Sequence, residues 1–393
     1  MPIINRIADF HDEMTAWRRD LHAHPETAFE EFRTSGIVAA KLEEWGIAVH
    51  RGLGGTGVVG TLTAGSASGT DRVIALRADM DALNMQELND FPHASRVPGK
   101  MHGCGHDGHT AMLLGAARYL AETRNFDGTV HFIFQPAEEG KGGAQKMVQE
   151  GLFDLFPARE VYGMHNWPEM PAGSIAVRTG PIMAAADQFD IRVQGHGAHA
   201  AMPHHGVDPV VVAAHVVTAL QSLVSRNTDP LRSAVVSVTQ IHGGAAYNVI
   251  PAEVILSGTV RTFEPAVQDS VEAGLKRVAT ATAEAFGGSA EVDYRRNYPA
   301  TVNTAAETDF AARVAAQVVG EAQVIHDPAP SMGAEDFAFM LKERPGSYVW
   351  IGQAGGPSAC MVHNPRYDFN DEILPVGASY WAKLVESALP RAA

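Results

Sequence analysis

Apolar runs that each end in polar residues most constrain how this chain can fold. Residues 72–77, 129–134 and 161–164 are three such runs, and a helix is predicted over 109–123, between the first two. Continuous apolar runs are typical of strands buried on both faces, and their alternation with helices predicts a doubly wound α/β domain with a mostly parallel central sheet. In such sheets ligands bind beyond the carboxyl ends of the strands. We therefore expect the polar residues after these runs to form one site.

The hydrophobic pattern changes near residue 182, which indicates a second, smaller unit. Residues 188–193 alternate apolar and polar side chains, as half-buried strands do, and a helix is predicted over 209–225. At 393 residues the chain is long enough for two hydrophobic cores. The helix–strand alternation resumes after residue 298. We therefore predict a discontinuous larger domain, residues 1–181 and 299–393, with a smaller α+β domain, residues 182–298, inserted into it.

Charge and cysteine content limit the partners and the compartment. The formal net charge is -15 at pH 7 and the Lys and Arg residues are dispersed, so nucleic acid phosphates and anionic lipids would be repelled. The first residues lack the apolar stretch of a signal peptide, and no run of about 18 apolar residues is present. Of the two cysteines, Cys104 and Cys360, the one among histidines is a candidate metal ligand rather than half of a disulfide. We expect a cytoplasmic protein that binds neither nucleic acid nor a membrane.

Residues 52–57 match the G-x-G-x-x-G pattern of dinucleotide-binding loops, with Asp79 at a suitable distance downstream. That function requires a helix to begin at the last glycine, because the helix N-terminus holds the pyrophosphate. Residues 58–62 have the composition of a strand instead. We therefore predict a turn between two strands, with a nicotinamide-dependent oxidoreductase as the alternative.

Residues 101–109 combine one thiol, three imidazoles and a carboxylate with three glycines, ahead of the predicted helix. Thiolate and imidazole suit zinc and its neighbours, and glycines let a loop curl so that Cys104 and His106 point at one ion. A Gly-rich turn with a buried cysteine is the alternative, but so dense a polar cluster is costly to bury without a partner. We predict a metal site, with Asp107 orienting His106.

Glu138 and Glu139 follow the second apolar run and precede a flexible glycine-rich turn. Adjacent carboxylates can face one cavity where the regular alternation of a strand has ended. One could then bind metal while the other handles protons, although an acidic pair on a surface loop is the common alternative. His165 and His363, taken singly, are more often packing or surface histidines than ligands.

Taken together, these segments resemble the M20 metallopeptidase family, and specifically the amidohydrolase branch of hippurate hydrolases, N-acyl-amino-acid aminoacylases and plant auxin-conjugate hydrolases. The segments that carry the resemblance are 18–22, 77–83, 101–107, 135–139, 163–165, 197–204, 248–251 and 332–337. It therefore covers nearly the whole chain.

The resemblance implies a dinuclear metal site with Glu138 as general base. The implied metal ligands are Cys104, His106, Glu139, His165 and His363. Two divalent ions per subunit are expected, and these ligands accept zinc, manganese, cobalt or nickel. The broader family often has a ligating histidine where this chain has Asp79, so we expect Asp79 and Asp81 to support the ligands rather than bind metal.

The resemblance also assigns roles within the inserted domain, which in this family serves dimerisation and as a lid. His199 and Asn248 resemble residues that reach the active site of a neighbouring subunit, and Arg261 resembles an arginine that binds the substrate carboxylate. Without the resemblance, His199 would be interpreted as a turn residue and Arg261 as a charge on a strand face. A homodimer, or a higher homo-oligomer, is expected.

The implied activity is hydrolysis of the amide bond of N-acyl-L-amino acids, hippurate-like or N-acetylated, to a carboxylic acid and a free amino acid. The nearest alternative is a dipeptidase or carboxypeptidase on the same scaffold. A catalytically silent relative that only binds metal and ligand is a further alternative, against which the presence of Glu138 argues.

Overall fold

A computed structural model describes residues 3–66, 69, 72–355 and 360–391, and the chain forms two compact units. Unit 1 comprises Met1–Ile182, Val302–Ala329 and Asp336–Ala393. Unit 2 comprises Met183–Thr301 and Pro330–Glu335. The chain thus leaves unit 1 after the first long segment and returns to it twice.

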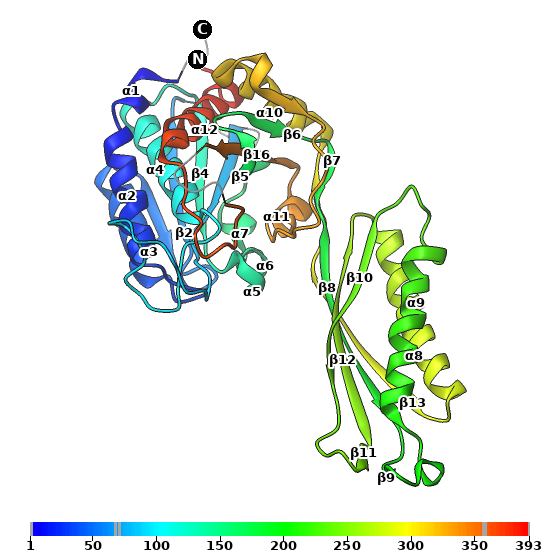
Figure 1. Cartoon of the computed structure of the whole chain (residues 1–393). Coiled ribbons are helices and arrows are strands. Elements are labelled where there is room, and N and C mark those ends of the chain that lie inside the picture. Colours follow the sequence, from blue (N-terminus) through cyan, green and yellow to red (C-terminus); the bar gives the residue numbers. More distant parts are fainter. Residues whose placement is uncertain (1–2, 67–68, 70–71, 356–359, 392–393) are drawn as a thin grey trace. The chain divides into compact units, whose positions relative to one another are not determined.

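Within the described residues, eight strands form the central sheet of unit 1 (Figure 1). In spatial order they are β1 (Ala48–Arg51), β2 (Val58–Ala64), β4 (Gly128–Gln135), β3 (Val73–Asp79), β5 (Glu160–Pro171), β16 (Gly346–Ala354), β6 (Ile175–Val177) and β15 (Val324–His326). The four neighbours from β4 to β16 are parallel, as are β6 and β15, whereas β1, β2 and β6 add antiparallel pairings. The predicted α/β fold with a mostly parallel central sheet is confirmed.

Helices cover the sheet of unit 1, and the longer ones share one hydrophobic core with it. These are α2 (His11–Ala23), α3 (Phe32–Glu44), α4 (His106–Thr123), α10 (Ala305–Val319) and α12 (Leu374–Ala388), joined by the short α1 (Asn5–Ala8). Of the short helices α6 (Gly143–Gln149), α7 (Leu152–Leu155) and α11 (Ala338–Glu343), α6 packs against β4 and against the other two (Figure 1). Helices α1 and α2 are separated by Asp9 and Phe10, and the Phe10 side chain belongs to this core.

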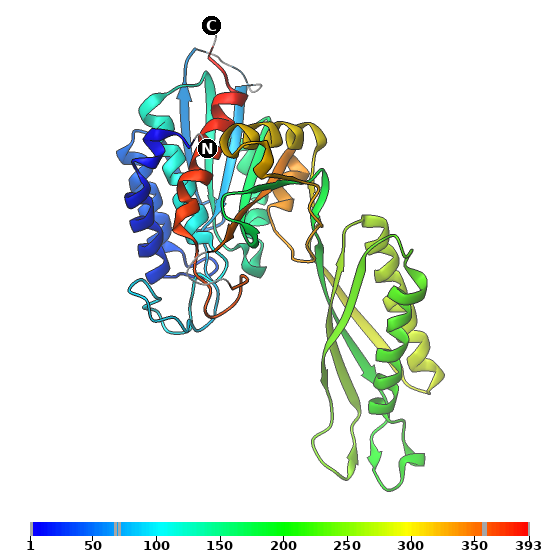
Figure 2. The same ribbon diagram turned by 45° about the horizontal axis from the view of Figure 1, so that its top comes forward.

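Unit 2 is a four-stranded antiparallel sheet with two helices side by side on one face (Figure 2). Its strands, in spatial order, are β10 (Ala234–His242), β12 (Glu253–Thr262), β8 (Ala185–Gln194) and β13 (Ser289–Tyr298), and its helices are α8 (Pro209–Ser222) and α9 (Pro265–Ala285). Helix α8 begins cleanly because the Asp208 carboxylate accepts the Val210 N–H at 2.9 Å.

Short elements complete the two units. They are β7 (Gly180–Met183) paired with β14 (Thr301–Asn303), β9 (Ala198–His199) paired with β11 (Val249–Ile250), and the helical turns η2 (Pro203–His205), η3 (Leu223–Asn227), η4 (Glu321–Gln323) and η5 (Asp371–Ile373). One helical segment of the described chain, Pro209–Asn227, is long and apolar enough to cross a membrane. Its buried residues Val212, Val216 and Leu220 belong to the core of unit 2. Core helices of other folds commonly reach the same length and hydropathy.

The glycine-rich segment at residues 52–57 is a turn between β1 and β2, as predicted. It is closed by hydrogen bonds from Gly52 N to Gly57 O (2.9 Å) and from Gly57 N to Leu53 O (3.0 Å). A strand, not a helix, follows the last glycine, so no helix N-terminus faces a pyrophosphate there.

Candidate metal centre

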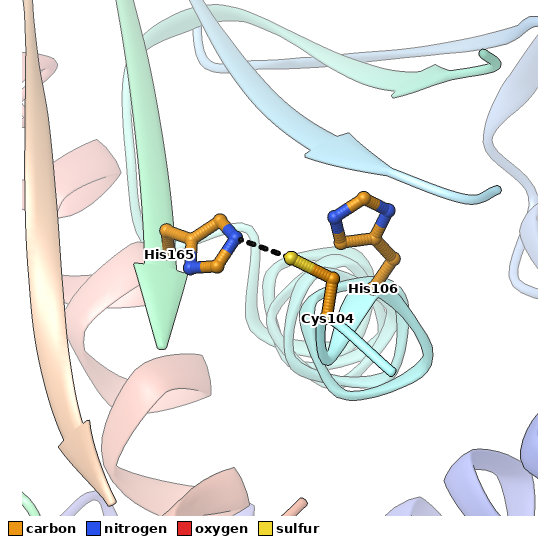
Figure 3. Close-up of side chains that lie close together, drawn as sticks. All are labelled: Cys104, His106 and His165. Carbon is orange, nitrogen blue, oxygen red and sulfur yellow. Dashed lines mark hydrogen bonds between the residues drawn. The ribbon is translucent and has the colours of Figure 1, made fainter. Parts of the chain in front are cut away.

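The first candidate ligands lie at the start of α4, where the chain turns sharply at Gly105. This residue has φ 92°, and a Cβ atom there would lie 2.2 Å from Asn166 Oδ1, so only glycine fits. The turn places Cys104 and His106 beside the middle of β5, which supplies His165 and continues beyond it to Pro171. Figure 3 shows the three side chains gathered together, with Cys104 Sγ 3.3 Å from His165 Nε2.

Glu138, Glu139 and His363 join this cluster from two other segments. The glutamates begin the short α5 (Glu138–Lys141), directly after β4. Ligand atoms of Cys104, Glu139 and His363 lie within 4.8 Å of one another, as do those of His106, Glu138 and Glu139. His363 is 52% exposed, and its Nε2 lies 3.2 Å from Glu139 Oε1. The structure thus brings the five candidate ligands and Glu138 together in unit 1.

Hydrogen bonds to the far side of two imidazole rings leave their other nitrogens facing the cluster. His165 Nδ1 lies 2.7 Å from the Asn166 carbonyl oxygen, and His106 Nδ1 lies 2.9 Å from the Asp81 carbonyl oxygen. A carbonyl only accepts, so each Nδ1 donates its proton, and Nε2 of the neutral ring then offers its lone pair to the cluster. His106 Nε2 is buried and has no hydrogen-bond partner among the described residues. A buried orphan of this kind indicates a site for a cation.

The electrostatics of the cluster also fit a cation. Burial and the neighbouring Glu139 carboxylate raise the pKa of the Cys104 thiol well above its usual value. Burial disfavours the imidazolium of His106, yet the Asp79 carboxylate raises the pKa of that ring to about 10. A divalent ion held by these residues would supply positive charge here, since it would favour a thiolate at Cys104 and a neutral imidazole at His106. Thiolate, imidazole and carboxylate together suit zinc and other first-row divalent metals.

Asp81 contacts two candidate ligands, Glu139 and His106, at atoms that do not face the cluster. Its carboxylate accepts the Glu139 backbone N–H at 2.9 Å and lies 3.3 Å from His106 Nδ1. Asp81 is 1% exposed and lies two residues beyond the end of β3. Asp81 therefore fixes the orientation of groups that face the cluster.

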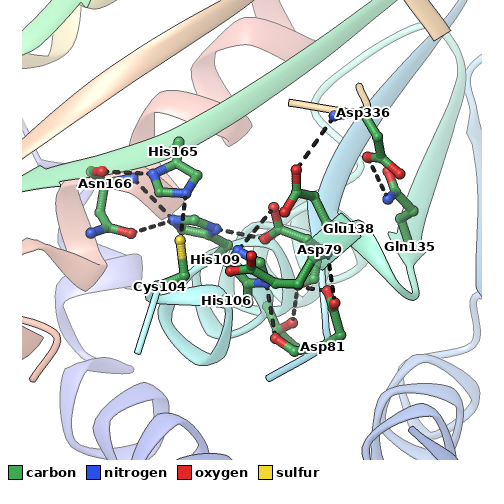
Figure 4. A network of polar contacts seen from close by, with 12 residues as sticks. Asp79, Asp81, Cys104, His106, His109, Gln135, Glu138, His165, Asn166 and Asp336 are labelled. Atoms are coloured by element: carbon green, nitrogen blue, oxygen red, sulfur yellow. Dashed lines mark hydrogen bonds and ion pairs between the residues drawn. The ribbon is translucent and has the colours of Figure 1, made fainter. Parts of the chain in front are cut away.

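Asp79 belongs to a second buried chain of hydrogen bonds beside the cluster (Figure 4). Its Oδ1 lies 2.6 Å from His109 Nδ1, and its Oδ2 accepts from Arg77 at 2.8 Å. His109 Nε2 in turn lies 2.7 Å from Asn166 Oδ1 and 3.0 Å from the Asn166 backbone nitrogen. Because His106 Nε2 lies 3.7 Å from Asp79, this chain reaches the edge of the candidate site.

The prediction that Asp107 orients His106 is wrong. Asp107 points away from the cluster to a buried ion-pair network, where its Oδ2 lies 2.8 Å from His22 Nδ1 and 3.7 Å from Arg18. His22 Nε2 lies 3.2 Å from Glu87. Successive residues at the start of a helix point in directions about 100° apart, so Asp107 cannot share the direction of His106.

We predict that the free energy of unfolding falls as pH rises from about 6.5 to about 9. Burial opposes the charge on His22, but its contacts with Asp107 and Glu87 raise the pKa of the ring to about 9, from 6.5 in the unfolded chain. The imidazolium therefore stabilises the fold fully below pH 6.5 and loses that contribution, on the order of 3 kcal/mol, by pH 9. Urea unfolding of the metal-loaded protein at several pH values measures this slope.

The matched variant is His22→Asn, which cannot titrate in this range. Its unfolding free energy is expected to depend less steeply on pH than that of the wild type between these limits. Equal slopes in the two proteins would show that His22 is not charged in the folded state.

The candidate residues of unit 2 fall at opposite ends of its sheet. His199 is exposed on β9 and pairs with Val249 of β11. Val249 directly follows Asn248 in the sequence, so Asn248 lies close to His199. Arg261 lies on β12, eight residues beyond Glu253, which corresponds to about 27 Å along a strand. Its guanidinium donates to Thr259 Oγ1 and to the Val260 carbonyl oxygen, and burial lowers its pKa. Unit 2 therefore brings His199 and Asn248 together and leaves Arg261 apart from them.

Two supporting residues were not singled out from the sequence. His109 lies one helical turn after His106, a spacing that places both on the same face of α4, and this was the available signal. Asn166 follows His165 directly on β5, where the alternation of a strand places their side chains on opposite faces of the sheet. Only its contacts with His109 and Tyr367 identify it as part of the buried network.

Comparison with known proteins agrees with this geometry. The model of "Peptidase family M20/M25/M40" matches residues 75–387 of the chain. The hippurate hydrolase of Campylobacter jejuni is 39% identical, over 98% of this chain and 98% of its own length. An N-acetylcysteine deacetylase of Bacillus subtilis is 40% identical, over 95% of this chain and 96% of its own length.

A solved structure extends the similarity to three dimensions. The crystal structure of a dinuclear metal binding peptidase of the M20 family from Bacillus subtilis has a TM-score of 0.84 and 36% sequence identity. The match covers 97% of this chain and 99% of that chain. Together with the clustered thiol, imidazole and carboxylate groups, this similarity supports binding of divalent metal by unit 1.

Proposed function

Because the chain belongs to peptidase family M20/M25/M40, we propose that it is a metal-dependent amidohydrolase of N-acyl-L-amino acids. The products are a carboxylic acid and a free amino acid. The observation that carries this proposal is a set of overlapping groups of ligand atoms: Cys104 with His106 and His165, Cys104 with Glu139 and His363, and His106 with Glu138 and Glu139. Relatives of similar length are named for hydrolysis of hippurate and deacetylation of N-acetylcysteine.

We place two divalent metal ions in each subunit, held by these five residues. When bound, the metals polarise the amide carbonyl and lower the pKa of water, so that an amide can be hydrolysed near neutral pH. Zinc, manganese, cobalt and nickel all suit this mixture of thiolate, imidazole and carboxylate ligands. The structural neighbour is named a dinuclear metal binding peptidase, which supports two metal ions per subunit.

Glu138 acts as the general base in this proposal. It takes a proton from the attacking water and passes it to the leaving amine, a role worth about 10²- to 10⁴-fold in rate. Its side chain is nearly buried, at 7% exposure, and Glu138 Oε1 accepts the Asp336 N–H at 3.4 Å, so its orientation is restricted. Glu139 is placed as a ligand because it lies close to both Cys104 and His363.

Arg261 binds the α-carboxylate of the substrate in this proposal, and His199 stabilises the developing oxyanion. We further propose that the protein is a homodimer, in which His199 and Asn248 complete the active site of the neighbouring subunit. Their exposure at one end of unit 2 supports this role, since neither side chain is enclosed within its own unit. Both cysteines are free, which suits a reducing cytoplasm as the compartment.

Subunit mixing tests the shared site. His199→Ala protein and Glu138→Gln protein are each expected to be inactive on their own. After subunit exchange, a mixed dimer contains one site with both defects and one with neither. Activity should therefore return to about half of the wild-type value per mixed dimer.

Each variant taken alone through the same exchange procedure is the control for this experiment. Exchange itself is verified with differently tagged subunits. If tagged subunits exchange and the mixture stays inactive, His199 acts within its own chain and the shared site is wrong.

A substrate panel tests the proposed activity directly. Metal-stripped protein is reloaded with zinc, manganese, cobalt or nickel and assayed with N-benzoyl- and N-acetyl-amino acids and with matched dipeptides. We expect kcat/KM to be higher for the N-acyl-amino acids. Preference for the dipeptides would make the protein a dipeptidase on the same scaffold, and no hydrolysis with any metal would contradict an amidohydrolase.

A further inference from the structure

The two adjacent glutamates of the site follow a residue with a left-handed backbone. Ala137 has φ 54° and ψ 42°, a conformation that costs a residue other than glycine on the order of 1 kcal/mol. It is the last residue before Glu138, at the point where the chain leaves β4. The direction in which Glu138 and Glu139 point therefore depends on holding this residue in an unfavourable conformation.

A buried carboxylate from a distant part of the chain contacts this residue. Glu31 Oε1 accepts the Ala137 N–H at 3.0 Å and also the Phe29 N–H at 3.0 Å. Glu31 Oε2 accepts the hydroxyl proton of Thr56. All four residues belong to unit 1, and Glu31 has no exposed surface.

The environment of Glu31 is unfavourable for a charge. Burial raises the pKa of the Glu31 carboxyl to about 7, and the nearby Asp81 carboxylate acts in the same direction. Within the described part of the chain, no Lys or Arg forms an ion pair with it. Burial of a carboxyl group in such surroundings costs free energy unless hydrogen bonds compensate for the lost water. Those bonds are directed at backbone and hydroxyl donors, one of them the left-handed Ala137.

The flanks of the same turn are fixed separately. Asp336 accepts from Gln135 Nε2 at 2.8 Å on the strand side and from the Ala144 N–H at 2.9 Å beyond the turn. Asp81 accepts the Glu139 N–H. The Ala137 carbonyl oxygen accepts the Gly143 N–H at 3.0 Å. Glu31 adds the partner for the Ala137 N–H, on the other side of the strained residue.

We propose that Glu31 is a positioning residue of the active site: by accepting the Ala137 N–H, it holds the left-handed turn that presents Glu138 and Glu139 to metal and substrate. Its effect on turnover rests on the proposed function. Its effect on metal binding does not, because Glu139 is a candidate ligand whatever the substrate.

The main test is Glu31→Ala, measured by steady-state kinetics and by titration of the metal-stripped protein with manganese or zinc in a calorimeter. Loss of the hydrogen bond should lower kcat and metal affinity by about tenfold each, while KM changes much less. Glu31→Gln keeps an acceptor oxygen for the Ala137 N–H, and its amide can donate to Thr56, so it should retain most of both properties.

A second substitution separates positioning from general destabilisation. Glycine adopts positive φ without strain, so Ala137→Gly should restore most of the lost kcat and metal affinity in the Glu31→Ala background. Glu26→Ala is the matched control, since Glu26 also accepts two backbone N–H groups, from Arg33 and Thr34, but makes no contact with Ala137. Glu26→Ala should change thermal stability without a tenfold loss of metal affinity.

Three results would overturn the proposal: wild-type kcat and metal affinity in folded Glu31→Ala, failure of Ala137→Gly to restore them, or an equal loss in Glu26→Ala. If Glu31→Ala does not fold, Glu31→Asp serves in its place, because its shorter side chain keeps the charge but cannot reach the Ala137 N–H. If the wild type hydrolyses no N-acyl amino acid, the proposed function fails, and the metal titrations alone still decide the role of Glu31.

Discussion

Removal of divalent metal by a chelator is expected to abolish hydrolysis of N-acyl amino acids completely, and added zinc, manganese, cobalt or nickel should restore it. Water and an unactivated amide react negligibly near neutral pH. A divalent metal polarises the amide carbonyl more strongly than a side chain of the site could. The ligand set also predicts a stability effect, because a metal that binds only the folded state stabilises it by mass action. The thermal midpoint should therefore fall on chelation and recover on reloading.

Elemental analysis of the stripped sample is the necessary control, since tightly held metal escapes brief treatment with a chelator. Circular dichroism of the same sample establishes that the chain is still folded when activity is measured. Full activity in a folded sample with no measurable metal would contradict the mechanism. Partial activity should scale with the metal content that remains.

The architecture of unit 1 was predictable because its strands are continuous apolar runs that only a sheet buried on both faces can accommodate. The runs at 72–77 and 129–134 correspond to β3 and β4, and the polar residues after them do meet at one edge of the sheet. Boundaries were less predictable. Helix α4 begins at His106 rather than His109, because the turn at Gly105 and not the hydrophobic pattern decides where it starts.

The candidate ligands could be listed from the sequence, but their supporting contacts could not. Asp107 follows His106 directly and was assigned to it, whereas the structure gives that role to Asp81, 25 residues earlier in the chain. Sequence distance carries no information on which carboxylate lies behind a given imidazole. The contact between Glu31 and Ala137 spans 106 residues and was equally inaccessible to a search for local motifs.

Local backbone geometry makes the two glutamates distinguishable although they are adjacent. Inside the short α5, Glu139 has ψ 77°, which is not helical, so its side chain departs from the direction that a regular helix would give it. Burial opposes ionisation of Glu139, but the contact with His363 and the charge of His106 lower the pKa of its carboxyl, which keeps it ionised as a metal ligand must be. Glu138 instead contacts the Asp336 backbone.

Substitution of these glutamates one at a time should therefore give two different losses. Glu138→Gln is expected to keep the full metal content and to lose at least about 10²-fold in kcat, as removal of a general base does. Glu139→Gln is expected to lose metal as well, because a neutral amide is a much weaker ligand than a carboxylate. Metal content by elemental analysis and kcat with saturating substrate, measured on the same samples, distinguish the two. If Glu138→Gln loses the metal and Glu139→Gln keeps it, the roles within the pair are exchanged.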